Sequence, residues 1–442
     1  MLSFLHRLAV VAILLATRPC HALRPDHSLR SPEYAPRGHV NAVYFIKWGI
    51  YDRSFYPQHI DVSHISHVLY AFLGVEPDGT VYSKDEYADF MAQFDGDSYE
   101  EHKRNAYGCV KQLFLLKKSN RHLKTLLSIG GWGAGSANFS SAASTPGRRV
   151  RFASTSVSLM WNWGFDGIDI DWEFPYDEID AANLVLLLEA IRNELDLYAR
   201  TYTSGHHFLL SIAAPAAPEH YQKLHLNDIG RIVDQINLMA YEYSGSWDHI
   251  SGHNANLFPY KRPVTRLNLD YTLTESFETS INTDYAIKDY LGAGVPAEKI
   301  VLGIPVFGRS FEDNLGVGKT FSGVGEGSWG ERGVWDYKAL PKEGATIMYD
   351  PNAQASFSYD QRKRELISYD TPSVVQKKAE YVLGHGLGGS MFWEASADKQ
   401  GDESLIRTSY RTFGSLETTE NWLDYANSYF DNIATKMGED YV

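Results

Sequence analysis

The sequence predicts an α/β fold, a (β/α)8 barrel of the TIM type with a small α+β insertion between the seventh and eighth strands. The first observation is that eight short runs rich in β-branched, aliphatic and aromatic residues recur along the 442-residue chain. The second is that stretches with helical periodicity separate these runs, an alternation typical of a parallel sheet covered by helices. The count of eight then favours a closed barrel over an open doubly wound sheet.

The candidate strands are short enough to be buried between helices. They lie at residues 41–48, 67–75, 124–132, 165–173, 207–216, 235–243, 300–308 and 386–394. Between the fourth and the fifth, residues 181–200 read AANLVLLLEAIRNELDLYAR, in which apolar residues recur at intervals of three and four. This spacing places them on one face of a helix, as a helix that covers a sheet requires.

The gap between the seventh and eighth strands is too long for a single helix. Residues 310–365 contain glycines, aromatic residues and the β-like run ATIMYD, which predicts a small α+β insertion at the loop end of the barrel. We therefore assign the barrel to residues 39–309 and 366–412. The remaining tail, residues 413–442, is expected to form one or two helices packed against the outside.

Residues 1–22 have the organisation of a secretory signal peptide. A lightly basic start precedes an apolar run from Leu8 to Ala16, and small or neutral residues lead to a cleavage point after Ala22. A membrane anchor is the alternative, but the run has only about half of the roughly 20 residues needed to span a bilayer. A Pro/Arg-rich connector follows at 23–38. We therefore expect a secreted, extracellular protein.

The overall charge argues against nucleic acid and anionic membranes as partners. Asp and Glu number 55 against 41 Lys and Arg, a formal net charge of -14, and such a surface repels phosphate backbones and anionic lipid. The 16 histidines have no HExxH or similar spacing, so we predict no metal. The run SIGGW lacks the spacing and the lysine of a phosphate-binding loop, and we predict no cofactor.

The fourth candidate strand carries four acidic residues in a run that is otherwise hydrophobic. In FDGIDIDWEFP, residues 165–175, alternation along a strand directs Asp169, Asp171 and Glu173 to one face. Like charges this close cannot all remain ionised, so some of the carboxyls hold protons near neutral pH. Glu173 is the last of them and the nearest to the C-terminal mouth, where barrel enzymes act. It is therefore the candidate general acid.

A solvated acidic strand at a sheet edge is the alternative interpretation. Ile168, Ile170 and Trp172 argue against it, because they indicate a buried strand in which carboxyls without a function would meet a large desolvation cost. Asp166 lies out of register with the inward face. We expect a structural role for it, in pairing with backbone or with a neighbouring part of the barrel.

The run DGIDIDWEFP resembles the signature of glycoside hydrolase family 18, the chitinases. Further runs similar to that family extend over most of the mature chain, namely VYFIKWGIYDRSF, SIGGW, NLMAYEYSGSW, GIPVFGRSF, GVWDYKALP and GGSMFWEAS. The run GVWDYKALP and the insertion resemble the fungal secreted members, which are built as a single catalytic domain. The resemblance implies a secreted chitinase that acts on β-1,4-linked N-acetylglucosamine polymers and chitooligosaccharides.

The resemblance also implies substrate-assisted catalysis with retention of configuration, an exception to the two-carboxylate route of most glycosidases. Glu173 would protonate the glycosidic oxygen while the acetamide carbonyl of the cleaved sugar attacks its anomeric carbon to give an oxazolinium ion. Asp171 would orient the acetamide N–H and stabilise that cation. Asp169 would share a proton with Asp171 as Asp171 turns between its partners. Tyr241 matches the tyrosine whose hydroxyl meets the acetamide oxygen.

Further residues are assigned to the substrate cleft by the resemblance and by their places at the strand ends. Trp393 matches the tryptophan under the cleaved sugar, where an indole face can stack on apolar C–H groups. The other expected contacts are Tyr44, Phe72, Gly131, Trp132, Met239, Glu242 and Arg309. The alternative for the aromatic residues and for Met239 is ordinary core packing. For Arg309 it is a salt bridge on the surface or one that anchors the insertion.

Two positions depart from the family pattern. The family has MxYD at the sixth strand, whereas MAYEY here places Glu242 where Asp is expected. The extra methylene moves the carboxylate by about 1.5 Å, and about 1 Å of misplacement in an active site can cost about 100-fold in rate. Phe307 likewise replaces the tyrosine of the family's YGRSF run.

Two alternative functions stay open, and the substitution at Glu242 is the only feature that favours the first of them. The first is a chitin-binding, chitinase-like lectin with weak or no hydrolysis, although the presence of Glu173 favours an enzyme. The second is a family 18 endoglycosidase that trims N-linked glycans, which the long insertion fits less well.

Overall fold

The computed structural model describes residues 38–97, 103–260 and 281–438. The signal peptide expected at residues 1–22 and all but the last residue of the connector lie outside the described residues. Within the described ranges, no helix is both long and apolar enough to cross a membrane.

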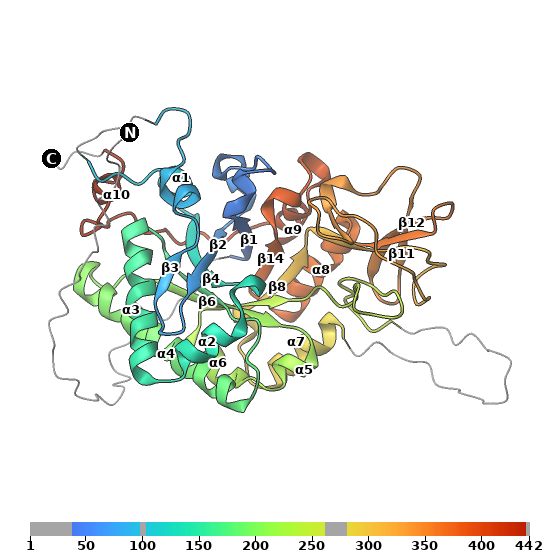
Figure 1. The fold of residues 1–442 in the computed structure, drawn as a ribbon, viewed down its shortest axis with the longest axis horizontal. Helices are drawn as coiled ribbons and strands as arrows, with labels where there is room; N and C mark the ends of the chain where they lie inside the picture. The colour runs from blue at the N-terminus through green and yellow to red at the C-terminus, as the bar shows by residue number, and fades with distance from the viewer. Residues whose placement is uncertain (1–37, 98–102, 261–280, 439–442) are drawn as a thin grey trace, which may run out of the picture.

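Eight parallel strands close into a barrel, so the predicted (β/α)8 fold is confirmed (Figure 1). β1 pairs with β14 on one side and with β2 on the other, which closes the ring. In order around the ring the strands are β1 (Val40–Ile46), β2 (His67–Val75), β4 (Lys124–Gly130), β5 (Gly167–Asp171), β6 (Leu209–Pro215), β7 (Gln235–Met239), β8 (Ile300–Pro305) and β14 (Gly389–Trp393). A short strand, β3 (Val81–Ser83), pairs antiparallel with β2.

Most of the observed strands end earlier than the predicted runs. β5 ends at Asp171, so Glu173 lies two residues beyond the strand. Tyr241 likewise lies two residues beyond the end of β7. Both side chains therefore belong to the loops at the carboxyl ends of the strands. In a barrel of this type these loops form the active-site face.

Helices cover the outside of the barrel (Figure 1). They are α1 (Gly108–Ser119), α2 (Ser136–Ala143), α3 (Pro146–Trp163), α4 (Glu178–Tyr202), α5 (Pro218–Tyr221), α6 (Leu226–Ile232), α7 (Thr283–Gly292), α8 (Pro372–His385) and α9 (Leu405–Phe413). α4, which contains the predicted helix, begins where the Asp177 side chain accepts two backbone N–H groups. α3 ends at Gly164, which adopts the left-handed conformation with φ +72°.

Two apolar clusters divide the core. The larger lies between the strands and the helices and includes Ile168, Ile170 and Trp172. The smaller fills the barrel interior around Tyr44 and Met391. Because successive side chains of a strand point to opposite faces, burial of the isoleucines in the outer cluster directs the acidic residues of β5 into the barrel.

The insertion is an antiparallel sheet of five strands between β8 and α8. Its order is β10 (Val334–Asp336), β9 (Phe307–Phe311), β13 (Glu365–Ser368), β12 (Ala355–Asp360) and β11 (Thr346–Asp350). Figure 1 shows β11 and β12 at one end of the long axis, opposite α3 and α10 (Asp431–Ala434). Across residues 307–368 the helical part of the expected α+β unit is a single 3-10 turn, Tyr337–Ala339. The many glycines between β9 and β11 disfavour a longer helix.

The described part of the C-terminal tail is mostly not helical. After α9, the only helix among the described tail residues is α10 (Asp431–Ala434). The intervening chain lies at the amino ends of the barrel strands, where it bonds to residues of the barrel. The N–H of Trp422 donates to Asp166 over 2.9 Å, and the carboxylate of Glu417 pairs with Lys124.

Asp166 holds this end of the barrel together. It lies just before β5, 2% exposed, and accepts from the ammonium of Lys117 over 2.6 Å and from the N–H of Thr125 over 2.8 Å. These partners are a neighbouring barrel element and the backbone. They correspond to the structural role that its out-of-register position suggested.

Candidate active site

Asp169 is the most firmly held carboxylate of the site. It is fully buried, and each of its oxygens accepts two hydrogen bonds. The donors are the hydroxyls of Tyr44 at 2.9 Å, Ser128 at 2.7 Å and Ser211 at 2.6 Å and the amide of Asn237 at 3.2 Å. Burial raises the pKa of Asp169, while these donors act in the opposite direction.

Asp171 has the opposite surroundings. It is 3% exposed, and its Oδ1 atom is buried without a hydrogen-bond partner. Burial first, and then the charges of Glu173 and Asp169, raise the pKa of Asp171 well above its usual range. A buried carboxyl oxygen without a donor is costly. This atom is therefore free to form a hydrogen bond with a bound ligand.

Glu173 combines partial exposure with a raised pKa. Burial, and secondly the charge of Glu242, raise the pKa of Glu173 to about 7, although the backbone N–H of Trp132 donates to its carboxyl and opposes the shift. A glutamic acid with this pKa keeps its proton at mildly acidic pH and can still release it. These are the properties of a general acid.

Aromatic side chains surround the three carboxyls at the barrel mouth. Phe72, Met239, Tyr241 and Trp393 are partly buried and pack on the interior cluster that contains Tyr44. The rings of Phe72 and Trp393 are stacked, with centroids 5.7 Å apart and an interplanar angle of 18°. The ring centroid of Tyr44 lies 5.2 Å from that of Trp393. The structure thus brings side chains of β1, β2, β14 and the end of β7 together with the carboxyls of β5.

The loop after β4 closes this wall. Gly131 has φ +77°, and a Cβ atom there would lie 2.5 Å from the ring of Phe72. Only glycine fits this conformation and this space without strain. Trp132 follows in a 3-10 turn, Trp132–Ala134, and is 77% exposed, which leaves its indole available to a ligand.

Glu242, one of the two departures from the family pattern, forms an ion pair. Its backbone adopts φ +62°, and its carboxylate pairs with the guanidinium of Arg309 in β9. Arg309 is 8% exposed, and its guanidinium carbon lies 5.0 Å from the ring centroid of Trp247. The longer side chain therefore joins the barrel mouth to the insertion sheet.

Comparison with known proteins places this arrangement in a family. The model for glycosyl hydrolases family 18 matches residues 40–398. The chain belongs to this family.

Two fungal proteins named as chitinases match nearly the whole chain. It is 53% identical over 442 residues to Endochitinase 1 of Metarhizium robertsii, with 98% of this chain and 99% of that protein covered. It is 51% identical over 438 residues to Chitinase 1 of Aphanocladium album, with 99% of this chain and 100% of that protein covered. The resemblance drawn from the motifs and the expectation of a glycoside hydrolase are confirmed.

A solved chitinase structure has a similar fold. It is the Group IV chitinase of Ostrinia furnacalis in complex with allosamidin, which is 28% identical. The TM-score is 0.73, and the match covers 86% of this chain and 99% of that one.

Several side chains of the site were not identified from the sequence. Ser128 and Ser211 lie in register with Asp169 on the neighbouring strands β4 and β6, so all three point into the barrel at one level. A polar residue at an inward position of an apolar strand was the available signal. Trp247 and Trp48 were also missed; they are 55% and 42% exposed, and the ring centroid of Trp48 lies 6.1 Å from that of Phe72.

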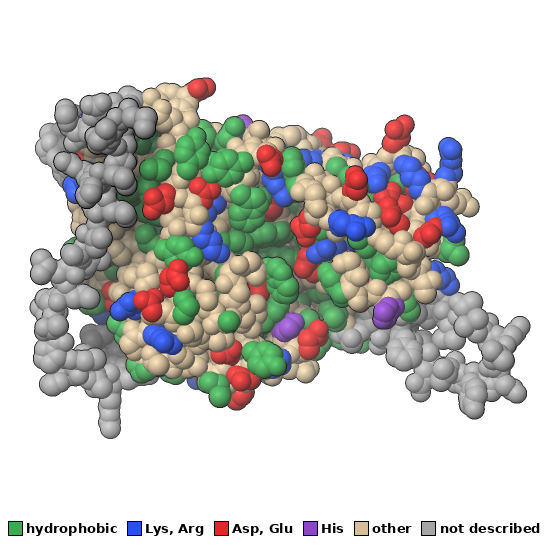
Figure 2. Space-filling view, viewed as in Figure 1, with side chains coloured by type: hydrophobic (Ala, Val, Ile, Leu, Met, Phe, Trp, Pro, Cys, Tyr) green, Lys and Arg blue, Asp and Glu red, His purple; other side chains and the backbone are tan. Residues whose placement is uncertain are grey.

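The surface of the molecule is hollowed beside the insertion. Figure 2 shows green apolar side chains gathered in a hollow near the middle of the viewed face, with red carboxylates at its edge. In the same view, Figure 1 shows barrel strands beneath this region and the insertion sheet beside it. Within the described ranges, no three His, Cys, Asp or Glu side chains form a group that could hold a metal ion.

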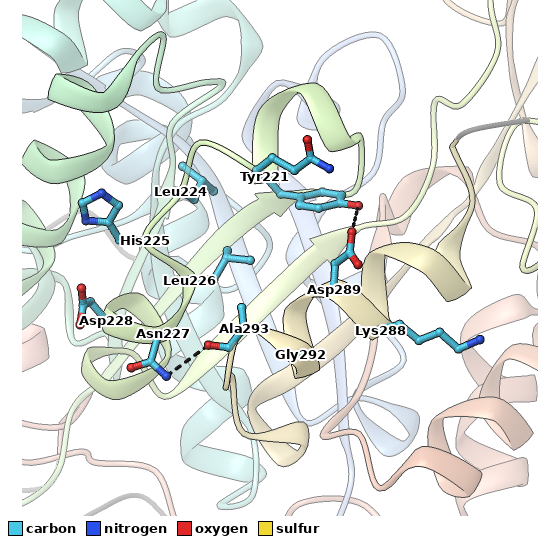
Figure 3. A pocket seen from close by; sticks show the side chains of 11 residues that line it. Tyr221, Leu224, His225, Leu226, Asn227, Asp228, Lys288, Asp289, Gly292 and Ala293 are labelled. Atoms are coloured by element: carbon cyan, nitrogen blue, oxygen red, sulfur yellow. Dashed lines mark hydrogen bonds between the residues drawn. The ribbon is translucent and has the colours of Figure 1, made fainter.

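A separate cavity of about 550 Å³ lies between α5, α6 and α7 (Figure 3). Its lining includes Tyr221, whose hydroxyl donates to Asp289 over 2.6 Å, and Asn227, whose amide donates to the carbonyl oxygen of Ala293 over 3.2 Å. None of the predicted site residues lines it. We therefore assign the chemistry to the barrel mouth and not to this cavity.

Proposed function

We propose that this protein is a secreted chitinase that hydrolyses β-1,4-linked N-acetylglucosamine polymers by substrate-assisted catalysis with retention of configuration. The observation that carries the proposal is that two neighbouring carboxyls have unlike properties. Glu173 has a pKa of about 7, and Asp171 has a buried oxygen without a hydrogen-bond partner. The names of the relatives, Endochitinase 1 and Chitinase 1, support chitin as the substrate.

Glu173 supplies the proton in the first step. The C–O bond to the leaving sugar breaks, the departing oxygen takes the proton of Glu173, and the acetamide oxygen of the retained sugar bonds to its anomeric carbon. The product is an oxazolinium ion that carries one positive charge. Water then attacks the anomeric carbon, the bond from that carbon to the acetamide oxygen breaks and the neutral acetamide re-forms. Ionised Glu173 takes a proton from the attacking water, which restores the acid.

Asp171 serves the acetamide in this scheme. Its free Oδ1 accepts the acetamide N–H, which turns the carbonyl oxygen towards the anomeric carbon. As the oxazolinium charge develops, the charged form of Asp171 becomes favourable, and the nearby cation offsets the burial that raises its pKa. The proton that Asp171 gives up passes to Asp169, so the two aspartic acids share one proton, and the hydroxyls that donate to Asp169 can rotate to make room for it.

The remaining residues bind and shape the sugar. The indole of Trp393 is the platform under the retained sugar, and the hydroxyl of Tyr241 donates to the acetamide oxygen. Tyr44, Phe72 and Met239 line the floor, while Gly131 and exposed Trp132 border the leaving side. Glu242 and Arg309 bind hydroxyls at the insertion wall. Aromatic rings favour sugars because pyranose C–H groups form flat apolar faces.

Secretion rests on the amino-terminal residues alone. A basic start, an apolar run of signal-peptide length and a small-residue cleavage point precede the barrel. The proposed mature chain begins after Ala22.

The test is to incubate the mature protein with chitin hexamer and to follow the products and their anomeric form by NMR. Initial release of β-anomer products is the expected result, because two inversions at the anomeric carbon retain its configuration. The sizes of the first products distinguish internal from terminal attack. Binding of the hexamer without cleavage would contradict the proposal and favour a lectin, and initial release of the α-anomer would contradict the retaining route.

A further inference from the structure

Ser136 connects the two residues that flank Glu173. The indole N–H of Trp172 donates to the hydroxyl oxygen of Ser136 over 2.7 Å, and that hydroxyl donates to the carbonyl oxygen of Phe174 over 2.7 Å. One side chain at the start of α2 therefore holds the chain on both sides of the proposed acid. A hydroxyl is suited to this because it donates and accepts at the same time.

This contact is important because Glu173 lies beyond the end of its strand. β5 ends at Asp171, whose carbonyl accepts the N–H of Gly131. Beyond that residue, the strand ladder no longer determines the position of the backbone. Side-chain hydrogen bonds from neighbouring elements then fix where the acid lies.

Further contacts from the same region extend the support. Ser140, one turn along α2, donates to Asp180 of α4 over 2.6 Å, and Asp180 accepts the N–H of Tyr176 over 3.1 Å. The ring of Phe174 stacks on His220 of α5, with centroids 4.3 Å apart. The loop that carries Glu173 is thus held by α2, α4 and α5 together.

We propose that Ser136 is a positioning residue for Glu173, one that sets the direction and the solvation of the acid without touching substrate. The inference rests on the proposed function of Glu173. It also predicts a property that can be measured without substrate, the pKa of Glu173, because the hydration of that carboxyl depends on how tightly its loop is held.

Ser136→Ala removes the connection while leaving the carboxyl in place. The indole N–H of Trp172 and the carbonyl of Phe174 then lose their shared partner, and the loop relaxes. Since about 1 Å of misplacement can cost about 100-fold in rate, we expect kcat on chitin hexamer to fall by about 10-fold to 100-fold with KM within about 2-fold. Ser136→Thr keeps the hydroxyl and should restore kcat to within about 3-fold of the wild type.

Ser141→Ala is the matched control. Ser141 lies in the same helix and is also half-buried, but its hydroxyl accepts from Arg148 over 3.0 Å, away from Glu173. We expect kcat of this variant to stay within about 2-fold of the wild type, because it removes a hydrogen bond of ordinary strength remote from the acid. Equal kcat values in the Ser136 and Ser141 variants would overturn the proposal. If kcat falls in Ser136→Ala in step with thermal stability, and Ser136→Thr does not restore it, Ser136 has only a structural role.

A second readout separates this inference from the proposed function. The pKa of Glu173 can be measured without substrate by NMR titration of protein carrying carbon-13 in its glutamate carboxyls, with Glu173→Gln to assign the signal. A loosened loop admits water, so Ser136→Ala should lower the pKa of Glu173 towards its ordinary value, whereas Ser141→Ala should not. If the wild type fails to cleave the hexamer but this shift occurs, the proposed function fails and the positioning role stands. An unchanged titration in Ser136→Ala would refute the positioning role.

Discussion

Glu242→Gln should move the alkaline limb of the pH profile to lower pH. Glu173 acts as the acid only while it holds its proton, so activity falls as the pH rises through its pKa of about 7. The charge of Glu242 is the second cause that raises this pKa, after burial. Glutamine removes that charge and also leaves the guanidinium of Arg309 without its counterion. Both changes favour ionised Glu173.

The size of the shift is limited by solvent. The Glu242 side chain is 47% exposed and already paired with Arg309, so its repulsion of Glu173 is screened. An exposed interaction of this kind is worth at most about 1 kcal/mol, which corresponds to about 0.7 of a pKa unit. We therefore expect the midpoint of the alkaline limb of kcat/KM to fall by about 0.3 to 0.7 unit.

The assay is the initial rate on a soluble chitin oligosaccharide between about pH 4 and pH 10 at fixed ionic strength. Glu242→Asp is the matched control, because it keeps the charge and restores the residue expected from the family pattern. Its limb should remain near that of the wild type, whatever its absolute rate. A Gln variant whose limb is unmoved, or moves to higher pH, would refute the electrostatic coupling between Glu242 and Glu173.

Three other predictions follow from single contacts. Glu173→Gln should abolish cleavage of chitin hexamer while retaining its binding. Because the folded pKa of Glu173 is raised from 4.5 to about 7, the wild type loses stability between these pH values. In urea unfolding, the Gln variant should therefore exceed the wild type at pH 8 by no more than about 3 kcal/mol, and match it at pH 4. Equal stability at both pH values would contradict the raised pKa. Lys117→Ala leaves Asp166 buried without its counterion and should lower the free energy of unfolding by about 3 to 5 kcal/mol. A loss below about 1 kcal/mol would show that the Lys117–Asp166 ion pair does not stabilise the fold. Gly131→Ala should lower kcat/KM because its Cβ meets the ring of Phe72, whereas Gly133→Ala has no neighbour within 4 Å and should not. Equal kcat/KM values for the two alanine variants would contradict this close contact.

Patterns that repeat along the chain gave the correct architecture. The eight strands were found because a buried parallel strand is a continuous apolar run, and α4 was found because its apolar residues recur at helical spacing. The tail and the insertion were less predictable. Between α9 and α10 the backbone bonds to side chains such as Asp166 of the barrel, and no local pattern contains those partners.

The sequence by itself determined which residues of β5 face inward, which of them is nearest the barrel mouth and which family the motifs resemble. Alternation along a strand and the order of residues are local properties, so they can be read without a fold. Only the tertiary structure decided the unlike surroundings of the three carboxyls. Asp169 is saturated by donors from four other strands, whereas Asp171 keeps a free oxygen and Glu173 meets the charge of Glu242. These partners are far apart in sequence, and closure of the barrel is the physical event that brings them to one place.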